Sequence, residues 1–290
     1  MADQPSSSRL LGPVEIRELA AQHGVTPTKK LGQNFVHDAG TVRRIVSRSG
    51  VQPGESVLEV GPGLGSLTLG LLEAGVRVVA VELDGALAEA LPGTVLRKDP
   101  EWAGRLSVIN RDATELQVEE LPELPSALVA NLPYNVAVPI LLTLLRDLPT
   151  LRSALVMVQK EVADRLVAKR GSKTYGAPTV KLAWYGRSEH AGTIGPDVFW
   201  PRPNIDSGLV RFTAFEVPRG SEELRAATFR LIDAAFEQRR KMIRSSLKPV
   251  ISNPDDMTAI LAQAEVDPQA RPESLGVEQF LSIAKVWLNR

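Results

Sequence analysis

The sequence predicts an α/β fold, in which a Rossmann-like sheet, mostly parallel with an antiparallel edge, is followed by a small all-helical C-terminal domain. Three observations predict it. Short apolar runs alternate with helical patterns as far as about Leu166, which is typical of a parallel sheet with helices on both faces. A glycine-rich loop directly follows one of the first of these runs. From Ser221 onward the apolar residues recur only at helical spacing.

The first buried strand is predicted over 57–60, and the glycine-rich run 61–65 follows it at once. A helical pattern over 66–73 comes next. Glycines tolerate positive φ and allow a backbone to approach a ligand closely, so this loop is expected to border a ligand. The next strand, 76–81, ends at Glu82. This acid lies about 20 residues beyond the loop, the distance at which a carboxylate reaches a ribose hydroxyl in nucleotide-binding α/β folds.

Two further strands also end in polar groups. The strand predicted over 106–110 ends near Asp112, whose carboxylate can accept a hydrogen bond from the amine of an adenine. The strand over 127–130 is followed by Asn131-Leu132-Pro133-Tyr134. Here an amide oxygen can accept from a planar NH₂ group, the proline fixes φ, and the tyrosine can stack on a base. Since ligands bind beyond the carboxyl ends of parallel strands, the sequence predicts a site for a nucleoside and a second base.

The glycine loop restricts which nucleotide can bind. In the dinucleotide fingerprint G-x-G-x-x-G the third glycine comes later than Gly65, and position 66 is serine here. The lysine of an ATP-binding phosphate loop is missing as well. S-adenosylmethionine contains an adenosine without phosphate, so it is the predicted cofactor.

The remaining elements divide the chain into three parts. Residues 1–28 are predicted to form a partly disordered tail with one helix, 29–217 the catalytic domain, and 218–290 a helical RNA-binding domain that begins at an N-capping Ser221. The other predicted elements are helices over 41–49, 161–169 and 276–289, a strand over 155–158, and late edge strands over 181–185 and 209–215.

Composition contributes by exclusion. The chain has no cysteine and three scattered histidines, so neither a disulfide framework nor a metal site is expected. No apolar stretch approaches the ~20 residues of a membrane span, and the polar N-terminus lacks a signal-peptide core. These features predict a cytoplasmic protein without membrane contact.

The formal net charge is zero, but the distribution of charge favours nucleic acid. Five basic residues and no acid occur between positions 239 and 248, and a helix over this run would place Arg240, Arg244 and Lys248 on one face. The alternative is a solvated helix face. Because a base-binding turn precedes the run, contact with RNA phosphates is the favoured interpretation. The residues predicted to contact RNA are Lys29, Lys30, Arg239, Arg240, Lys241, Arg244 and Lys248.

From about Lys29 to its C-terminus, the sequence resembles the small-subunit ribosomal RNA adenine N6,N6-dimethyltransferases, which are class I methyltransferases. The resemblance rests on separated blocks whose order and spacing are specific together. These blocks are 30–38 (KLGQNFVHD), 59–65 (EVGPGLG), 81–84 (VELD), 111–113 (RDA), 131–135 (NLPYN), 159–166 (QKEVADRL), 201–207 (PRPNIDS) and 236–241 (FEQRRK).

The resemblance implies a role for each matching residue. Asn34 and Val36 would flank the cofactor, Gly61 would contact it through the backbone, and Ala113 would lie beside Asp112. Asn131 would border both the sulfonium and the target amine. Gly63 and Leu83 belong to the same blocks and complete the expected cofactor site. The implied substrate is 16S rRNA of the immature small subunit, and the implied assembly state is a monomer.

Two positions depart from the family pattern: Val36 replaces the usual leucine, and Arg202 stands where proline is more frequent. Three alternatives stay open. Large-subunit rRNA adenine methyltransferases of the macrolide-resistance type share the cofactor motifs, but they usually carry isoleucine at the position of Leu132 and often phenylalanine at that of Tyr134. The second alternative is a non-catalytic RNA-binding or assembly factor. The third is a small-molecule methyltransferase or a nucleotide-dependent dehydrogenase.

Overall fold

The computed structural model describes residues 9–25, 33–133 and 136–290, and the chain divides into two compact units. The first unit comprises residues up to 163 together with 189–213. The second comprises 164–188 and 214–290. The predicted boundary at 217/218 therefore differs from the observed one, because the segment around the helix α7 (Ala177–Tyr185) packs with the C-terminal helices.

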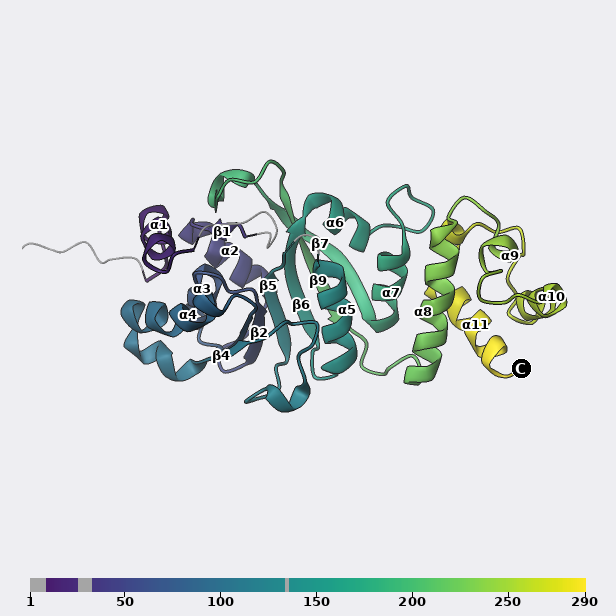
Figure 1. Cartoon of the computed structure of the whole chain (residues 1–290), viewed down its shortest axis with the longest axis horizontal. Coiled ribbons are helices and arrows are strands. Elements are labelled where there is room, and N and C mark those ends of the chain that lie inside the picture. The colour runs from purple at the N-terminus through teal and green to yellow at the C-terminus, as the bar shows by residue number, and fades with distance from the viewer. Residues whose placement is uncertain (1–8, 26–32, 134–135) are drawn as a thin grey trace, which may run out of the picture. The chain divides into compact units, whose positions relative to one another are not determined.

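A seven-stranded sheet runs through the first unit in the order β4-β3-β2-β5-β6-β9-β7 (Figure 1). Neighbouring strands are parallel throughout the part of the sheet that comprises β4, β3, β2, β5 and β6, and β9 pairs antiparallel with β6. The predicted fold class, a mostly parallel sheet with an antiparallel edge and a helical C-terminal part, is thereby confirmed. The strands are β2 (Ser56–Val60), β3 (Arg77–Glu82), β4 (Leu106–Asn110), β5 (Ala127–Asn131), β6 (Ser153–Gln159), β7 (Gly186–Ile194) and β9 (Ser207–Ala214).

The strand order reverses between β2 and β5. The chain proceeds from β2 outward through β3 to β4 and then returns to pair β5 with the other edge of β2. Such a reversal opens a crevice beyond the carboxyl ends of the two strands, where α/β proteins bind ligands. The connecting helices are α2 (Ala39–Ser49), α3 (Ser66–Glu73), α4 (Gly85–Lys98), α5 (Ala137–Asp147) and α6 (Lys160–Leu166), with short 3₁₀ turns at Pro100–Arg105, Val118–Glu120 and Pro196–Val198.

Local sequence explains where these helices begin. Asp38 caps α2 by accepting a hydrogen bond from the Thr41 N–H at 2.6 Å, and Gly50 ends the helix in the left-handed region with φ 76°. Asp84 caps α4 in the same way. Asp84 also lines the crevice, so this one residue both begins α4 and borders the place where a ligand can bind.

A second, two-stranded sheet holds the Asn-Phe-Val segment in place. Here β1 (Phe35–Val36) pairs antiparallel with β8 (Phe199–Trp200), and the rings of Phe35 and Trp200 stack 6.3 Å apart. The divergent Arg202 lies just beyond this sheet and pairs with Asp197 at 2.7 Å.

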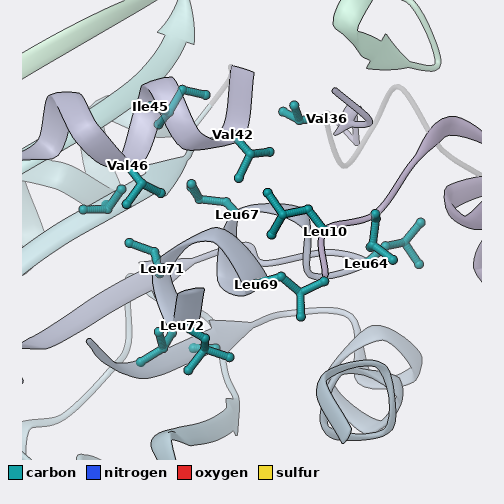
Figure 2. Packing of buried hydrophobic residues seen from close by; sticks show 14 of the residues in the cluster. Leu10, Val36, Val42, Ile45, Val46, Leu64, Leu67, Leu69, Leu71 and Leu72 are labelled. Atoms are coloured by element: carbon teal, nitrogen blue, oxygen red, sulfur yellow. The ribbon is translucent and has the colours of Figure 1, made fainter. Parts of the chain in front are cut away.

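The described part of the N-terminal region, residues 9–25, contains the one predicted helix and packs within the first unit. The helix α1 (Pro13–Gln22) buries Ile16, and the preceding Leu10 is 1% exposed. Leu10 lies among side chains of α3 and beside Leu64 of the glycine loop (Figure 2). Lys98 of α4 also donates a hydrogen bond to the Leu10 carbonyl at 3.2 Å.

The second unit is all-helical. Its elements are α7, α8 (Glu222–Glu237), α9 (Ile243–Ser246), α10 (Pro254–Gln263), a 3₁₀ turn at Pro272–Ser274 and α11 (Val277–Leu288). The Ser221 hydroxyl caps α8 as predicted, accepting from the Leu224 N–H at 3.2 Å. Its core is formed mainly by aliphatic side chains of these helices, together with aromatic residues of α7, α8 and α11 such as Phe280. In the part of the chain that the structure describes, no helix combines the length and apolar character of a membrane span.

Two predicted elements are wrong. The residues 181–185 form the end of the helix α7, and the edge strand begins only at Gly186. The basic run 239–248 is not one helix either, because α8 ends at Glu237 and only Ile243–Ser246 is helical again.

Candidate functional site

One pocket lies at the carboxyl ends of β2, β3, β4 and β5, within the first unit. Nine predicted cofactor residues line it: Asn34, Val36, Gly61, Gly63, Glu82, Leu83, Asp112, Ala113 and Asn131. Pro133 lines it too, whereas the side chain of Leu132 is buried in the core. Tyr134 lies outside the described residues. The pocket also contains residues that the sequence analysis did not single out, notably Phe35, Glu59, Ser66, Val136 and Ile140.

The glycine loop takes a backbone conformation that other residues rarely adopt. Gly61, Gly63 and Gly65 have φ values of 68°, 58° and 96°. A Cβ atom on Gly63 would lie 2.6 Å from Cε1 of Phe35, so the ring packs directly against the glycine backbone. The loop is thereby held between Phe35 on one side and the start of α3 on the other.

Replacing Gly63 with alanine is expected to weaken cofactor binding at least tenfold. The substitution combines a positive φ, which costs of order 1–2 kcal/mol for an L-residue, with a close contact to Phe35 that displaces the pocket wall. Titration calorimetry with S-adenosylhomocysteine measures the change. Gly54→Ala is the matched control, since Gly54 has φ 85° with no atom within 4 Å of its Cβ position, far from the pocket lining. Equal affinities for the two variants would contradict the expected role of the contact.

Glu82 is held by two backbone amides at the end of β3. The Gly63 N–H donates to Oε2 at 3.0 Å, and the Asp84 N–H donates to Oε1 at 3.0 Å. Burial raises the pKa of Glu82 above its usual range, and these two N–H groups oppose the rise. The carboxyl thus links the glycine loop to the turn after β3 and presents its remaining lone pairs to the pocket.

Asp112 is oriented by the residue two positions after it. Its Oδ1 accepts from the Thr114 N–H at 2.8 Å and from the Thr114 hydroxyl at 2.7 Å. Because these bonds fix the rotamer, Oδ2 is the oxygen that can accept from a ligand. Beside it, the Asn110 amide donates to the Glu82 carbonyl at 2.8 Å, which ties the end of β4 to the end of β3.

Asn131 is oriented from outside its own strand. Its Nδ2 donates to the Asn34 carbonyl at 3.1 Å. This bond fixes the orientation of the side-chain amide, so that Oδ1 is the atom that can accept a hydrogen bond from a ligand. The following backbone is also fixed, because the Leu132 N–H donates to the Met157 carbonyl at 3.0 Å and the Pro133 carbonyl accepts from the Val136 N–H at 3.2 Å. The turn therefore presents an oriented amide oxygen on a rigid backbone.

Glu59 was missed as a site residue, although it stands in one of the motif blocks. It is 1% exposed and lines the pocket from β2. Burial raises the pKa of Glu59 to about 8; the facing hydroxyl and N–H of Thr68 act against this rise, and the charge of Glu82 adds to it. An acid inside a buried apolar strand was the signal in the sequence that could have identified it.

The predicted RNA-binding residues differ in their surroundings. Arg239 is engaged within the second unit, pairing with Glu273 at 2.7 Å and donating to the carbonyls of Lys173 and Ser172. Arg240, Lys241, Arg244 and Lys248 are exposed in the same unit. Lys29 and Lys30 lie outside the described residues. Arg239 is therefore held in place by contacts within the second unit, whereas the side chains of Arg240, Lys241, Arg244 and Lys248 are exposed to solvent.

Comparison with known proteins gives consistent similarities. A model of the family described as ribosomal RNA adenine dimethylase matches residues 25–288. The chain is 60% identical over 276 residues to the ribosomal RNA small subunit methyltransferase A of Leifsonia xyli subsp. xyli (strain CTCB07), with 95% of this chain and 98% of the relative covered.

Solved structures are similar as well. A dimethyladenosine transferase from Plasmodium falciparum has a TM-score of 0.72 at 21% identity, covering 86% of this chain and 95% of that one. The 23S rRNA methyltransferase ErmE has a TM-score of 0.64 at 25% identity, covering 88% of this chain and 100% of that one.

Proposed function

The chain belongs to the ribosomal RNA adenine dimethylase family, and on this premise we propose that it dimethylates the N6 amines of two adjacent adenosines near the 3′ end of small-subunit (16S) rRNA, using S-adenosylmethionine. The substrate in the cell would be the immature small subunit in the cytoplasm, so that methylation contributes to its maturation. The comparison with small subunit methyltransferase A supports this choice of RNA.

The observation that carries the proposal is the order of polar groups along the sheet. Asp112 follows β4, Glu82 ends β3, the glycine loop follows β2, and Asn131 ends β5, and these four strands are neighbours in that order. Adenine, ribose and amino-acid portions follow one another in the same order in S-adenosylmethionine. Asp112 would therefore accept from the adenine amine and Glu82 from the ribose hydroxyls, with the amino-acid end at the glycine loop.

The chemistry at Asn131 follows from its orientation. When bound, S-adenosylmethionine supplies an electrophilic methyl group. Oδ1 of Asn131 would accept one N–H of the target amine, and the Leu132 carbonyl would accept the other, since the Pro133 carbonyl already accepts from Val136. Two acceptors hold the amine nitrogen in a tetrahedral geometry that localises its lone pair for attack. No strong base is required, because the proton becomes acidic only as the new bond forms, and orientation alone can contribute ~7–11 kcal/mol.

The same arrangement permits a second transfer. A monomethylated amine keeps one N–H, which one of the two acceptors can still hold. Val136 and Ile140 line the pocket close to the turn in sequence, and their apolar side chains provide surroundings that suit a methyl group. The target base must leave its RNA stack to reach this depth, and Tyr134 would stack on it there.

The test is transfer of labelled methyl groups from S-adenosylmethionine to small ribosomal subunits that lack the modification, followed by nucleoside analysis. We expect N6,N6-dimethyladenosine at two adjacent positions near the 3′ end of the small-subunit RNA. Fully methylated subunits are the control and should take up no label. Absence of label in unmodified subunits would overturn the assignment of substrate.

A second candidate comes from the similarity to the 23S rRNA methyltransferase ErmE. It would make large-subunit RNA the substrate, with the same transfer to an adenine amine. Parallel reactions with large subunits decide between the two: incorporation only there would favour this alternative, and we expect none.

A further inference from the structure

Glu59 is a buried carboxyl group that the proposed reaction does not use. It is 1% exposed in the middle of the sheet, and its Oε2 has no hydrogen-bond partner among the described residues. The same residue lines the pocket beneath the glycine loop. A buried ionised carboxylate without a partner is very unfavourable, so such a group either is neutral or awaits a cationic ligand.

A hydroxyl group of the same pocket is in this situation too. Ser66 Oγ, on the first turn of α3, is buried and also lacks a hydrogen-bond partner among the described residues. The charged group that acts on Glu59 is Glu82 at the end of β3, and α3 faces Glu59 with the neutral side chain of Thr68. The neutral amide of Asn131, at the end of β5, lines the same pocket. No cation among these neighbours neutralises Glu59, whereas an additional negative charge lies close to it.

The order of the strand ends indicates which part of the cofactor reaches this position. Asp112 and Glu82 occupy the adenosine side, at β4 and β3, and Asn131 occupies the transfer side, at β5. Glu59 lies on β2 between them, where the amino-acid end of the cofactor would lie, and that end carries an ammonium group. An ammonium has three N–H donors, which matches a set of acceptor oxygens that have no partner of their own.

We propose that Glu59 is protonated in the free protein and ionises when the cofactor's ammonium group binds beside it, so that cofactor binding releases one proton. The inference rests on the proposed function, because it requires the S-adenosylmethionine site. The O–H bond of Glu59 breaks, the proton passes to solvent, and the carboxylate pairs with the ammonium. The structure thus assigns to Glu59 and Ser66, which both line the pocket, the recognition of the cationic end.

The sign of the pH dependence follows. With its pKa raised to about 8, Glu59 is protonated in the free protein at neutral pH, and the bound ammonium favours its ionised form. Affinity for the cofactor should therefore rise roughly tenfold per pH unit between pH 6 and 7, where the ammonium itself stays protonated. Stability of the free protein should show the opposite trend, since a raised carboxyl pKa stabilises the fold at low pH and this contribution is lost as pH rises through the folded-state value.

The decisive experiment is titration calorimetry at pH 6.5 in two buffers of different ionisation enthalpy, which counts protons exchanged on binding. The wild-type protein should release about one proton with S-adenosylmethionine and with S-adenosylhomocysteine, which keeps the ammonium but lacks the sulfonium charge. It should release none with methylthioadenosine, which lacks the amino-acid end. Glu59→Gln should bind without this release and lose the tenfold pH slope. Glu73→Gln, a carboxylate at the end of α3 that pairs with Arg43 outside the pocket, is the matched control and should behave as wild type.

The outcomes separate the two proposals. Wild-type protein that binds no S-adenosylmethionine would overturn the proposed function and this inference together. Binding with no proton release, or equal release from Glu59→Gln, would overturn only the role of Glu59, as would release by S-adenosylmethionine but not by S-adenosylhomocysteine. If Glu59→Gln does not fold, infrared difference spectra of the wild type decide: loss of a protonated-carboxyl stretch on binding supports the proposal, and its absence overturns it.

Discussion

Replacing Asn131 with alanine is expected to lower the rate of methyl transfer by roughly 10²–10³-fold, the magnitude typical of removing one preorganised polar group from an active site. The reason is geometric, because the Nδ2–H bond to the Asn34 carbonyl fixes the direction of Oδ1 before any substrate arrives. Single-turnover rates with saturating unmodified small subunits isolate this effect from binding. Affinity for S-adenosylhomocysteine, measured in parallel, should change only a few-fold.

Asn131→Asp is the matched comparison. It keeps an acceptor for the target amine but loses the donor to Asn34, and its charge faces that carbonyl oxygen. Its rate should therefore also fall substantially, although its side chain is almost the same size. An alanine variant with a near-normal rate would refute the orienting role, and a fully active aspartate variant would show that the bond to Asn34 is dispensable.

Reversing the charge of both Arg240 and Arg244 to glutamate is expected to weaken binding of small-subunit RNA by about 10–100-fold near physiological salt. Both side chains are exposed in the second unit, and neither belongs to its hydrophobic core. If each contacts a phosphate, the slope of log affinity against log salt should become shallower by about two. Filter binding or fluorescence anisotropy over a salt series measures both quantities.

The control is Arg187→Glu with Lys285→Glu, which makes the same change in net charge at exposed positions of the second unit outside the basic run. This pair should shift the affinity much less. If both double variants lost the same amount of RNA affinity, the effect would come from net charge alone. An unchanged salt slope in the Arg240 and Arg244 variant would show that these residues do not contact phosphates and belong to an ordinary solvated surface.

The predicted cofactor residues come together in one pocket because the sequence signals that marked them are local. Each strand end that borders the pocket carries its polar residue directly after an apolar run, and parallel strands bring such ends to one edge of the sheet. What the sequence could not show is how these groups are oriented. The bonds from Asn131 to Asn34 and from Gly63 to Glu82 join segments that are 97 and 19 residues apart, and no periodicity reveals such pairs.

The wrong elements have identifiable causes. In the segment before Gly186, the apolar residues Val180, Leu182 and Trp184 alternate with less buried ones, which is the pattern expected of a strand. Pro178, in the first turn, was the signal for a helix. The edge strand that follows is mostly polar and buries only its two end residues, so it lacks the apolar alternation by which strands are recognised. The N-terminal Leu10 was overlooked because a short apolar run beside a polar tail gives no sign that it enters the core.

The bond between Asn131 and the Asn34 carbonyl also has a consequence for biosynthesis. During translation Asn34 leaves the ribosome long before Asn131, and β5 must take its place beside β2 before the two residues can meet in the native arrangement. Contacts of such high sequence separation form late, because the loop between them must close first. A nascent chain that already contains the glycine loop therefore has no oriented amide until β5 has joined the sheet, so the cofactor loop forms earlier than the group proposed to orient the target amine.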